Sequence, residues 1–230
     1  IKKVKIIRTN AFWQEYRKGC RGGDIRRLIS PEIGYADLDR LQVTQVDSMF
    51  AMFKNTKAII FDMRGFPNGT AWHIAPRLNK KGSKIYGALF EKPLLSSDEL
   101  SDDYKFDLSC TFFQPVPKTD KPAYTGKTVV LIDERAISQS EHTCLLFESV
   151  TDVTFIGSPT VGANGDVTRF YIPGNISIGL TGQSVRHADG RQLQRIGILP
   201  DIEITPTIEG IRYGKDEVLE RAIEFVKTGK

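Results

Sequence analysis

A serine that follows a short apolar run is the residue of this chain best placed for chemistry. Residues 129–132, Val-Val-Leu-Ile, predict a buried strand, and Ser138 precedes a segment, 139–150, that we predict to be a helix. A hydroxyl at such a turn projects from the sheet edge, where the unpaired N–H groups of the helix stabilise developing negative charge. The pattern predicts a nucleophile at Ser138. The alternative interpretation is structural, because serine is a preferred N-cap and Glu141 completes the spacing of a capping box.

Two further loops follow predicted buried strands and carry glycines. The segment 57–62 predicts a strand that leads into the loop 63–70. The segment 152–156 predicts another, which leads into the loop 157–165. In chain order, 63–70 is the first glycine loop, the turn with Ser138 is the second loop, and 157–165 is the third glycine loop. The ends of parallel strands converge on one crevice, so we expect both loops to lie beside Ser138. Glycines alone are a weak signal, because turns need them everywhere.

The order of the predicted elements indicates an α/β fold with mostly parallel strands, since strands and helices alternate along the chain. We expect residues 1–32 to be an N-terminal strand and linker remnant that packs on the core. Residues 33–230 should form one domain, with an irregular insertion at 80–121. The predicted strands are 4–7, 33–38, 57–62, 129–132 and 152–156, and the predicted helices are 43–54, 71–78, 139–150 and 216–227.

Composition and charge exclude several classes of function. The 230 residues carry a net charge of +4, and no dense basic stripe with interleaved aromatic residues indicates nucleic-acid binding. No apolar run approaches the roughly 20 residues that a membrane span needs. Cys20, Cys110 and Cys144 are widely spaced, and the sequence has neither a clustered metal-ligand set nor a phosphate loop. We therefore expect no cofactor, metal, nucleic-acid partner or membrane span, and the oligomeric state stays open.

Six short motifs stand in a characteristic order and spacing: 33–35, 59–69, 136–141, 157–162, 189–191 and 197–202. In this order they resemble the S41-type serine peptidases, which are the tail-specific or carboxy-terminal processing peptidases and their tricorn-like relatives. The resemblance implies a spiral of mostly parallel strands and helices like that of ClpP and crotonase. It also implies a polypeptide substrate, a structural ion pair of Asp62 with Arg64, and, by resemblance alone, a compartment outside the cytoplasm, periplasmic or secreted.

The resemblance implies roles for individual residues of the nucleophile and oxyanion machinery. Ser138 matches the family's nucleophile, and Ser140 is the lesser candidate. The backbone N–H groups of Gln139 and Gly69 match the donors of the oxyanion hole. Each such donor typically lowers the barrier by roughly 3 kcal/mol.

The general base is where the sequence departs from the family. The processing peptidases use a lysine just past a glycine of the third loop, and Ala163 stands there. The tricorn-like branch uses a histidine from upstream of the domain, oriented by a glutamate, and Gln194 matches that late position. A glutamine can orient a histidine but cannot stabilise an imidazolium with a charge. His73 and His142 are weaker candidates for a base within the chain, and we expect His187 to be solvated at a turn.

Three functions follow from these residues. The first is a serine endopeptidase acylated at Ser138, with a histidine base from outside this chain. Because the chain begins at Ile1 and not at Met, we expect it to be part of a longer protein. Without the histidine base, we expect the fragment alone to be inactive. The second function is a catalytically impaired relative that only binds peptide. The third, by fold analogy alone, is an acyl-CoA enzyme of the crotonase type.

Overall fold

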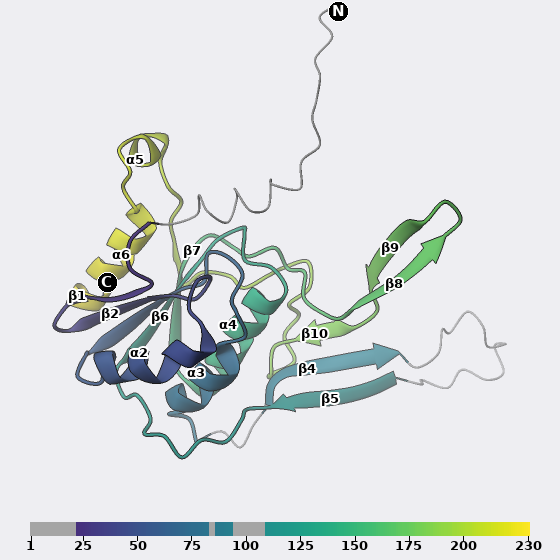
Figure 1. Ribbon diagram of the computed structural model, residues 1–230, viewed down its shortest axis with the longest axis horizontal. Helices are drawn as coiled ribbons and strands as arrows, with labels where there is room; N and C mark the ends of the chain where they lie inside the picture. Colours follow the sequence, from purple (N-terminus) through teal and green to yellow (C-terminus); the bar gives the residue numbers. More distant parts are fainter. Residues whose placement is uncertain (1–21, 83–85, 94–108) are drawn as a thin grey trace, which may run out of the picture.

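The computed structural model describes residues 22–82, 86–93 and 109–230. The predicted strand at 4–7, Cys20 and most of the expected N-terminal remnant lie outside these residues. The described chain forms a six-stranded sheet, a three-stranded sheet and a two-stranded hairpin (Figure 1).

The six-stranded sheet positions the three loops at one edge. Its order is β1-β2-β3-β6-β7-β11, and every neighbouring pair is parallel except β1 with β2. Near-continuous apolar strands are typical of a parallel sheet that is covered on both faces. The prediction of an α/β fold with mostly parallel strands is confirmed. The strands are β1 (Arg26–Ser30), β2 (Ile33–Asp37), β3 (Ala58–Asp62), β6 (Lys127–Ile132), β7 (Val153–Gly157) and β11 (Ile202–Glu203).

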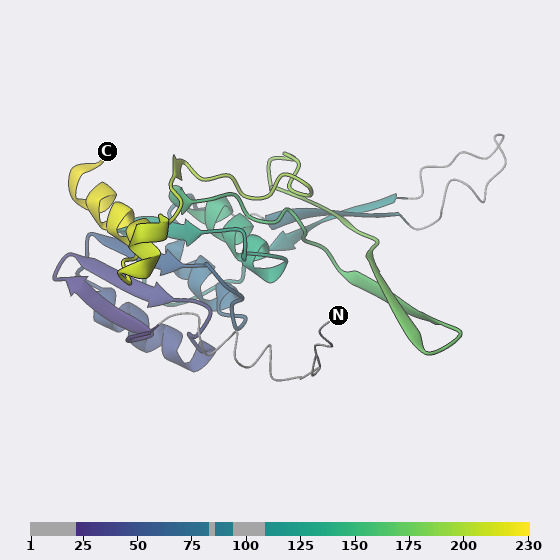
Figure 2. The same cartoon turned by 90° about the horizontal axis from the view of Figure 1, so that it is seen from above.

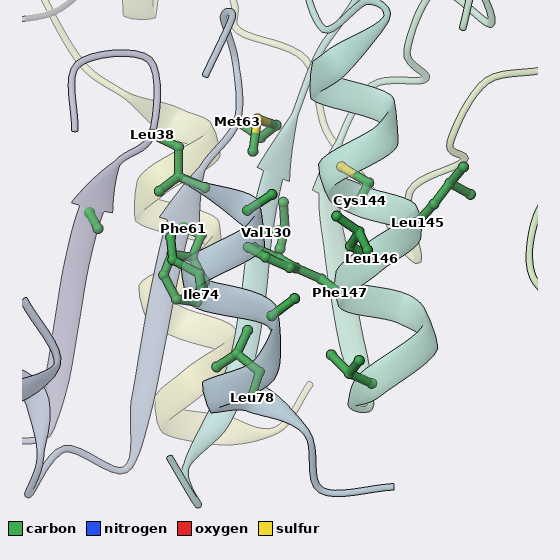
Figure 3. Packing of buried hydrophobic residues seen from close by; sticks show 14 of the residues in the cluster. Leu38, Phe61, Met63, Ile74, Leu78, Val130, Cys144, Leu145, Leu146 and Phe147 are labelled. Carbon is green, nitrogen blue, oxygen red and sulfur yellow. The ribbon is translucent and has the colours of Figure 1, made fainter. Parts of the chain in front are cut away.

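Helices cover the two faces of this sheet because successive side chains of a strand point in opposite directions. Ile59 and Phe61 of β3 pack into the core with α2, α3 and α4, whereas Ile60 packs with α6. Figure 3 shows Phe61 facing Phe147 of α4, with ring centroids 5.3 Å apart. The helices are the 3₁₀ turn η1 (Val43–Gln45), α2 (Val46–Phe53), α3 (Ala71–Leu78), α4 (Gln139–Val150), α5 (Ile208–Arg212) and α6 (Glu217–Thr228).

The expected irregular insertion at 80–121 contains two regular strands. They are β4 (Tyr86–Pro93) and β5 (Ser109–Pro115), which pair antiparallel, and β10 (Ser184–Arg186) joins the other edge of β4. The low periodicity of this region did not indicate their regular pairing, which joins β4 to β5 within the insertion and to β10 far along the chain. None of the helices in the described ranges is long and apolar enough to cross a bilayer.

The hairpin of β8 (Val167–Ile172) and β9 (Ile176–Thr181) extends away from the two sheets (Figures 1 and 2). Its strands follow the third glycine loop directly, so that loop connects the main sheet to the hairpin.

Candidate active site

Ser138 lies at the turn between β6 and α4, as the sequence predicts, and its backbone is in an unusual conformation. Its φ is +54° and its ψ is −110°. Residues other than glycine rarely adopt this backbone region, and doing so costs about 1–3 kcal/mol. Two hydrogen bonds hold it there: Ser138 N–H donates to the Ala163 carbonyl (3.1 Å), and His142 N–H donates to the Ser138 carbonyl (2.9 Å). The Ser138 side chain makes no capping bond, so the capping interpretation of its hydroxyl is wrong.

Glu141 holds the third glycine loop against α4. Its side chain is fully buried and accepts hydrogen bonds from the hydroxyl of Thr160 (2.6 Å) and from the backbone N–H groups of Gly162 (2.5 Å) and Ala163 (3.0 Å). The expected role as a cap of its own helix is therefore wrong. The carboxylate compensates its burial by accepting several donors from one loop.

Ser140 holds the first glycine loop on the same helix. Its side chain is buried, and its hydroxyl donates to the Gly65 carbonyl at 2.6 Å. This bond points Ser140 into the structure, which removes it as a nucleophile. Gly69, in the same loop, has a φ of +68°, and a Cβ built on it would lie 3.8 Å from the side-chain nitrogen of Gln139. The two residues with expected oxyanion donors are thus neighbours.

The predicted ion pair of Asp62 with Arg64 is present and has a third member. Arg64 Nη2 lies 2.7 Å from both Asp62 and Asp216, and Tyr35 donates its hydroxyl to Asp62 at 2.9 Å. Burial works against the charge of Arg64, but the two carboxylates outweigh it and raise the pKa of the guanidinium. The pair fixes the start of the first loop to the N-terminus of α6.

Ser138 and Gln139 line a cleft of about 430 Å³. The cleft contains mixed polar and aromatic groups, as a substrate site does. Gly69 is not among its lining residues and lies beside it, next to Gln139. The other residues around the cleft are Trp72, Phe90, Phe112, Phe113, Gln114, Pro115, His142, Asn164, Gly165, Asp166 and Gln183.

His142 lies in the wall of the cleft and is a weak base. Its ring stacks on Trp72 and contacts Phe90, with centroids 5.4 and 5.6 Å apart, and its Nε2 pairs with the side-chain oxygen of Gln114. Burial lowers the pKa of His142 to about 4, and Asp166 opposes this only in part. The imidazole is therefore neutral at pH 7.

The other two histidines lie away from Ser138. His73 is exposed on α3 and lines a separate cavity with Asp47 and Arg77. His187 is buried, and its Nδ1 lies 2.6 Å from Glu148, so the expectation of a solvated turn is wrong. Its partner is 39 positions earlier in the chain, which local sequence patterns do not reveal.

Gln194 and Asn164 link the third loop to β10. The Gln194 side chain donates to the carbonyls of Asn164 (2.6 Å) and Gln183 (2.8 Å), and accepts a long bond from Val185 N–H (3.4 Å). The Gln194 side chain thus holds the backbone of Asn164 and Gln183 in this structure. Asn164 is a site residue that sequence reasoning missed. Its side-chain oxygen accepts from Gly165 N–H, and its buried amide nitrogen has no partner in the described part of the chain.

Solved structures share this fold at low sequence identity. A protein of Parabacteroides merdae superposes with a TM-score of 0.71 and 20% identity, covering 93% of this chain and 68% of that one. Mature CPAF in complex with lactacystin superposes with a TM-score of 0.67 and 17% identity, covering 86% and 52%. Such identities show a common fold.

Sequence relatives and a family model give the assignment. A protein of Chlamydia pneumoniae is 29% identical over 119 residues, which are 50% of this chain and 19% of the relative. One of Chlamydia muridarum is 27% identical over 118 residues, 50% of this chain and 20% of the relative. The chain thus spans about a fifth of the curated relatives it matches. The model of peptidase family S41 matches residues 32–204, and the chain therefore belongs to peptidase family S41.

Proposed function

We propose that this chain is the catalytic domain of a serine endopeptidase of the carboxy-terminal processing or tricorn-like type, with Ser138 as the nucleophile. The observation that carries the proposal is the strained backbone of Ser138 at the N-terminus of α4, on a cleft. Strain of this kind persists where the surrounding structure holds it and is common at nucleophiles on strand-to-helix turns.

The proposed reaction is acyl transfer to the serine and then to water. The hydroxyl oxygen of Ser138 attacks the peptide carbonyl while its proton passes to the general base. The N–H groups of Gln139 and Gly69 stabilise the oxyanion, and the base returns the proton to the leaving amine. Water, deprotonated by the same base, then releases the acyl group and regenerates the hydroxyl.

We assign the base to a histidine outside this chain. Ala163 occupies the position next to Ser138 where the processing peptidases carry a lysine, and it cannot accept a proton. His142 is held by Gln114, and its lowered pKa makes it a poor acceptor. Gln194 can orient an incoming histidine only with its carbonyl oxygen, because both N–H groups are engaged with backbone.

Peptide binding is supported by β5 and by Asn164. Four consecutive residues of β5, 112–115, line the cleft, so the cleft follows the strand along its length. An extended peptide can therefore lie beside β5 and add to its sheet. The buried amide nitrogen of Asn164 is a donor that a peptide carbonyl can satisfy.

A fluorophosphonate probe and a polypeptide substrate test the nucleophile in the natural-length protein. We expect the probe to label Ser138, and Ser138→Ala to abolish labelling and to lower turnover by about a thousandfold or more. Ser149→Ala, in the same helix but outside the cleft, is the matched control and should retain both. Hydrolysis that survives Ser138→Ala would contradict the proposal.

Lysine replacements and the pH profile test the base. No lysine lies between Lys127 and Lys215, so turnover should survive replacement of each lysine in the chain. A histidine base ionises near pH 6.5, so kcat/KM should rise through one ionisation near neutrality. A lysine-to-alanine change that abolishes turnover in a folded protein would overturn the assignment. Labelling of the 230-residue chain alone would place the base within it, and His73 and His142 would be replaced first.

A second candidate is a peptide-binding relative without turnover. It is favoured by the absence of an ionisable side chain at Ala163 and by the engagement of His142 with Gln114. The two candidates differ in the labelling experiment. A relative of this kind binds peptide in the cleft with equal affinity in the parent chain and in Ser138→Ala, and neither form reacts with the probe.

A further inference from the structure

Four aromatic rings from four elements form a continuous series of contacts along the cleft, two stacked pairs joined by a tilted contact, which we call the aromatic stack. Trp72 of α3 stacks on His142 of α4, with an interplanar angle of 24°. His142 contacts Phe90 of β4, and Phe90 stacks on Phe112 of β5 at 5.1 Å and 11°. The stack joins the catalytic helix to the three-stranded sheet, and all four rings line the cleft that contains Ser138.

The stack is accessible to a ligand at its outer end. Phe112 is 44% exposed, although Phe90 and Trp72 are partly buried. Large apolar side chains that stay exposed in a concave site are typical of binding surfaces, because closing the site against a ligand removes their apolar area from water. An exposed phenylalanine on a flat surface carries no such meaning, but Phe112 lies in the same cleft as the nucleophile.

The stack is also uncharged where it meets the nucleophile. His142 is the titratable member, and its Nε2 is bound to the neutral side chain of Gln114. Burial holds the pKa of this imidazole at about 4, so the ring contributes a neutral aromatic face at pH 7. Asp166, the carboxylate that also lines the cleft, is exposed. Among the described residues that line the cleft, an apolar side chain therefore meets no buried charge along the rings.

We propose that this aromatic stack is the specificity pocket of the peptidase and takes a large aromatic side chain from a residue that flanks the scissile bond. The proposal rests on the proposed function for the position of the scissile bond, because Ser138 and the stack share one cleft. Aromatic rings prefer offset-stacked or edge-to-face contacts, which the exposed ring of Phe112 offers. A methyl side chain would leave most of the cleft, about 430 Å³, unfilled.

Binding to an inactive chain tests the pocket without turnover. The chain has two tryptophans, Trp13 and Trp72, so Trp13→Phe leaves Trp72 as the single fluorescent reporter. In a Trp13→Phe, Ser138→Ala background, we expect the blocked pentapeptide acetyl-Gly-Gly-Phe-Gly-Gly-amide to change Trp72 emission and to bind at least about tenfold more tightly than its alanine counterpart. Equal affinity of the two peptides would overturn the proposal.

Phe112→Ala and Phe170→Ala form a matched pair of variants. Both phenylalanines are 44% exposed on strands, but Phe170 lies on the β8–β9 hairpin, outside the cleft. Phe112→Ala should reduce the preference for phenylalanine over alanine about tenfold or more, and Phe170→Ala should leave it unchanged. An equal loss in both variants would overturn the proposal.

Turnover separates this inference from the proposed function. In the natural-length protein, we compare two peptides, with phenylalanine either just before or just after the cleaved bond, with their alanine counterparts. Phenylalanine should raise kcat/KM at one of these two positions, and Phe112→Ala should remove that gain. Selective binding without any hydrolysis would contradict the peptidase and leave the pocket standing. Hydrolysis dependent on Ser138 without a preference for phenylalanine would contradict the pocket alone.

Discussion

The backbone N–H of Ser138 donates a hydrogen bond of 3.1 Å to the carbonyl oxygen of Ala163. This contact places the third glycine loop directly against the proposed nucleophile. Under the proposed function, Ala163 matches the lysine of the processing peptidases, and this bond places the backbone of that residue beside the backbone of Ser138.

A lysine at position 163 should supply a base within the chain. Ala163 is exposed, so a longer side chain fits without displacing the core. A general base typically contributes a factor of about 100 or more. We expect Ala163→Lys to react with a fluorophosphonate at least about tenfold faster than Ala163→Met at about pH 9, where a lysine near its ordinary pKa begins to lose its proton. Equal rates for the two variants would show that the side chain at 163 does not reach Ser138.

Glycine at position 138 should stabilise the fold relative to alanine. Both substitutions remove the hydroxyl, but only glycine adopts the φ of +54° without strain. The relieved strain of about 1–3 kcal/mol exceeds the added chain entropy of about 1 kcal/mol. Urea unfolding should give Ser138→Gly a free energy of unfolding about 1 kcal/mol above that of Ser138→Ala. At Ser149, within the same helix, the alanine variant should be more stable than the glycine variant. If alanine is also the more stable replacement at position 138, the backbone of Ser138 is not strained.

Replacement of Glu141 by glutamine should release the third loop. One carboxylate oxygen accepts from Thr160 and Gly162 and the other from Ala163, whereas an amide keeps one oxygen and directs its N–H donors at a group that is itself a donor. We expect the free energy of unfolding to fall by about 2 kcal/mol, because a donor of the loop is left unpaired and faces another donor. Glu220→Gln, exposed on α6, should cost less than about 0.5 kcal/mol. A small effect at Glu141 in chemical denaturation would mean that the loop is held by other contacts.

The burial of His142 should make the fold less stable in acid. Its pKa is about 4 in the folded chain and about 6.5 when unfolded, so the unfolded state binds more protons between these values. The contribution of the neutral ring is complete above pH 6.5 and is lost as the pH falls toward 4. Between pH 7 and 5 the loss should be about 2 kcal/mol. His142→Phe should remove this part of the pH dependence while it keeps an aromatic ring in the stack. His73→Phe should leave the pH dependence unchanged. Urea unfolding of both variants at pH 7 and pH 5 measures the difference.

The sequence alone was sufficient for the central strands of the main sheet, for its main helices and for the position of Ser138 at the turn after β6. Unbroken apolar runs predicted β3 and β6, and the helix at 71–78 has the predicted bounds, because each signal lies within one segment. The turn after β6 could be predicted for the same reason. A serine between a strand and the following helix must lie at the carboxyl end of that strand, where the loops of a parallel sheet meet.

The tertiary structure decided which groups Ser138 meets. Glu141 binds a loop about 20 positions away, His187 finds Glu148, and the aromatic stack draws one ring from each of four elements. Pairings of this kind depend on which faces of distant segments come together. Burial then sets their chemistry, as for the neutral ring of His142, since desolvation follows from the surrounding packing and not from residue type.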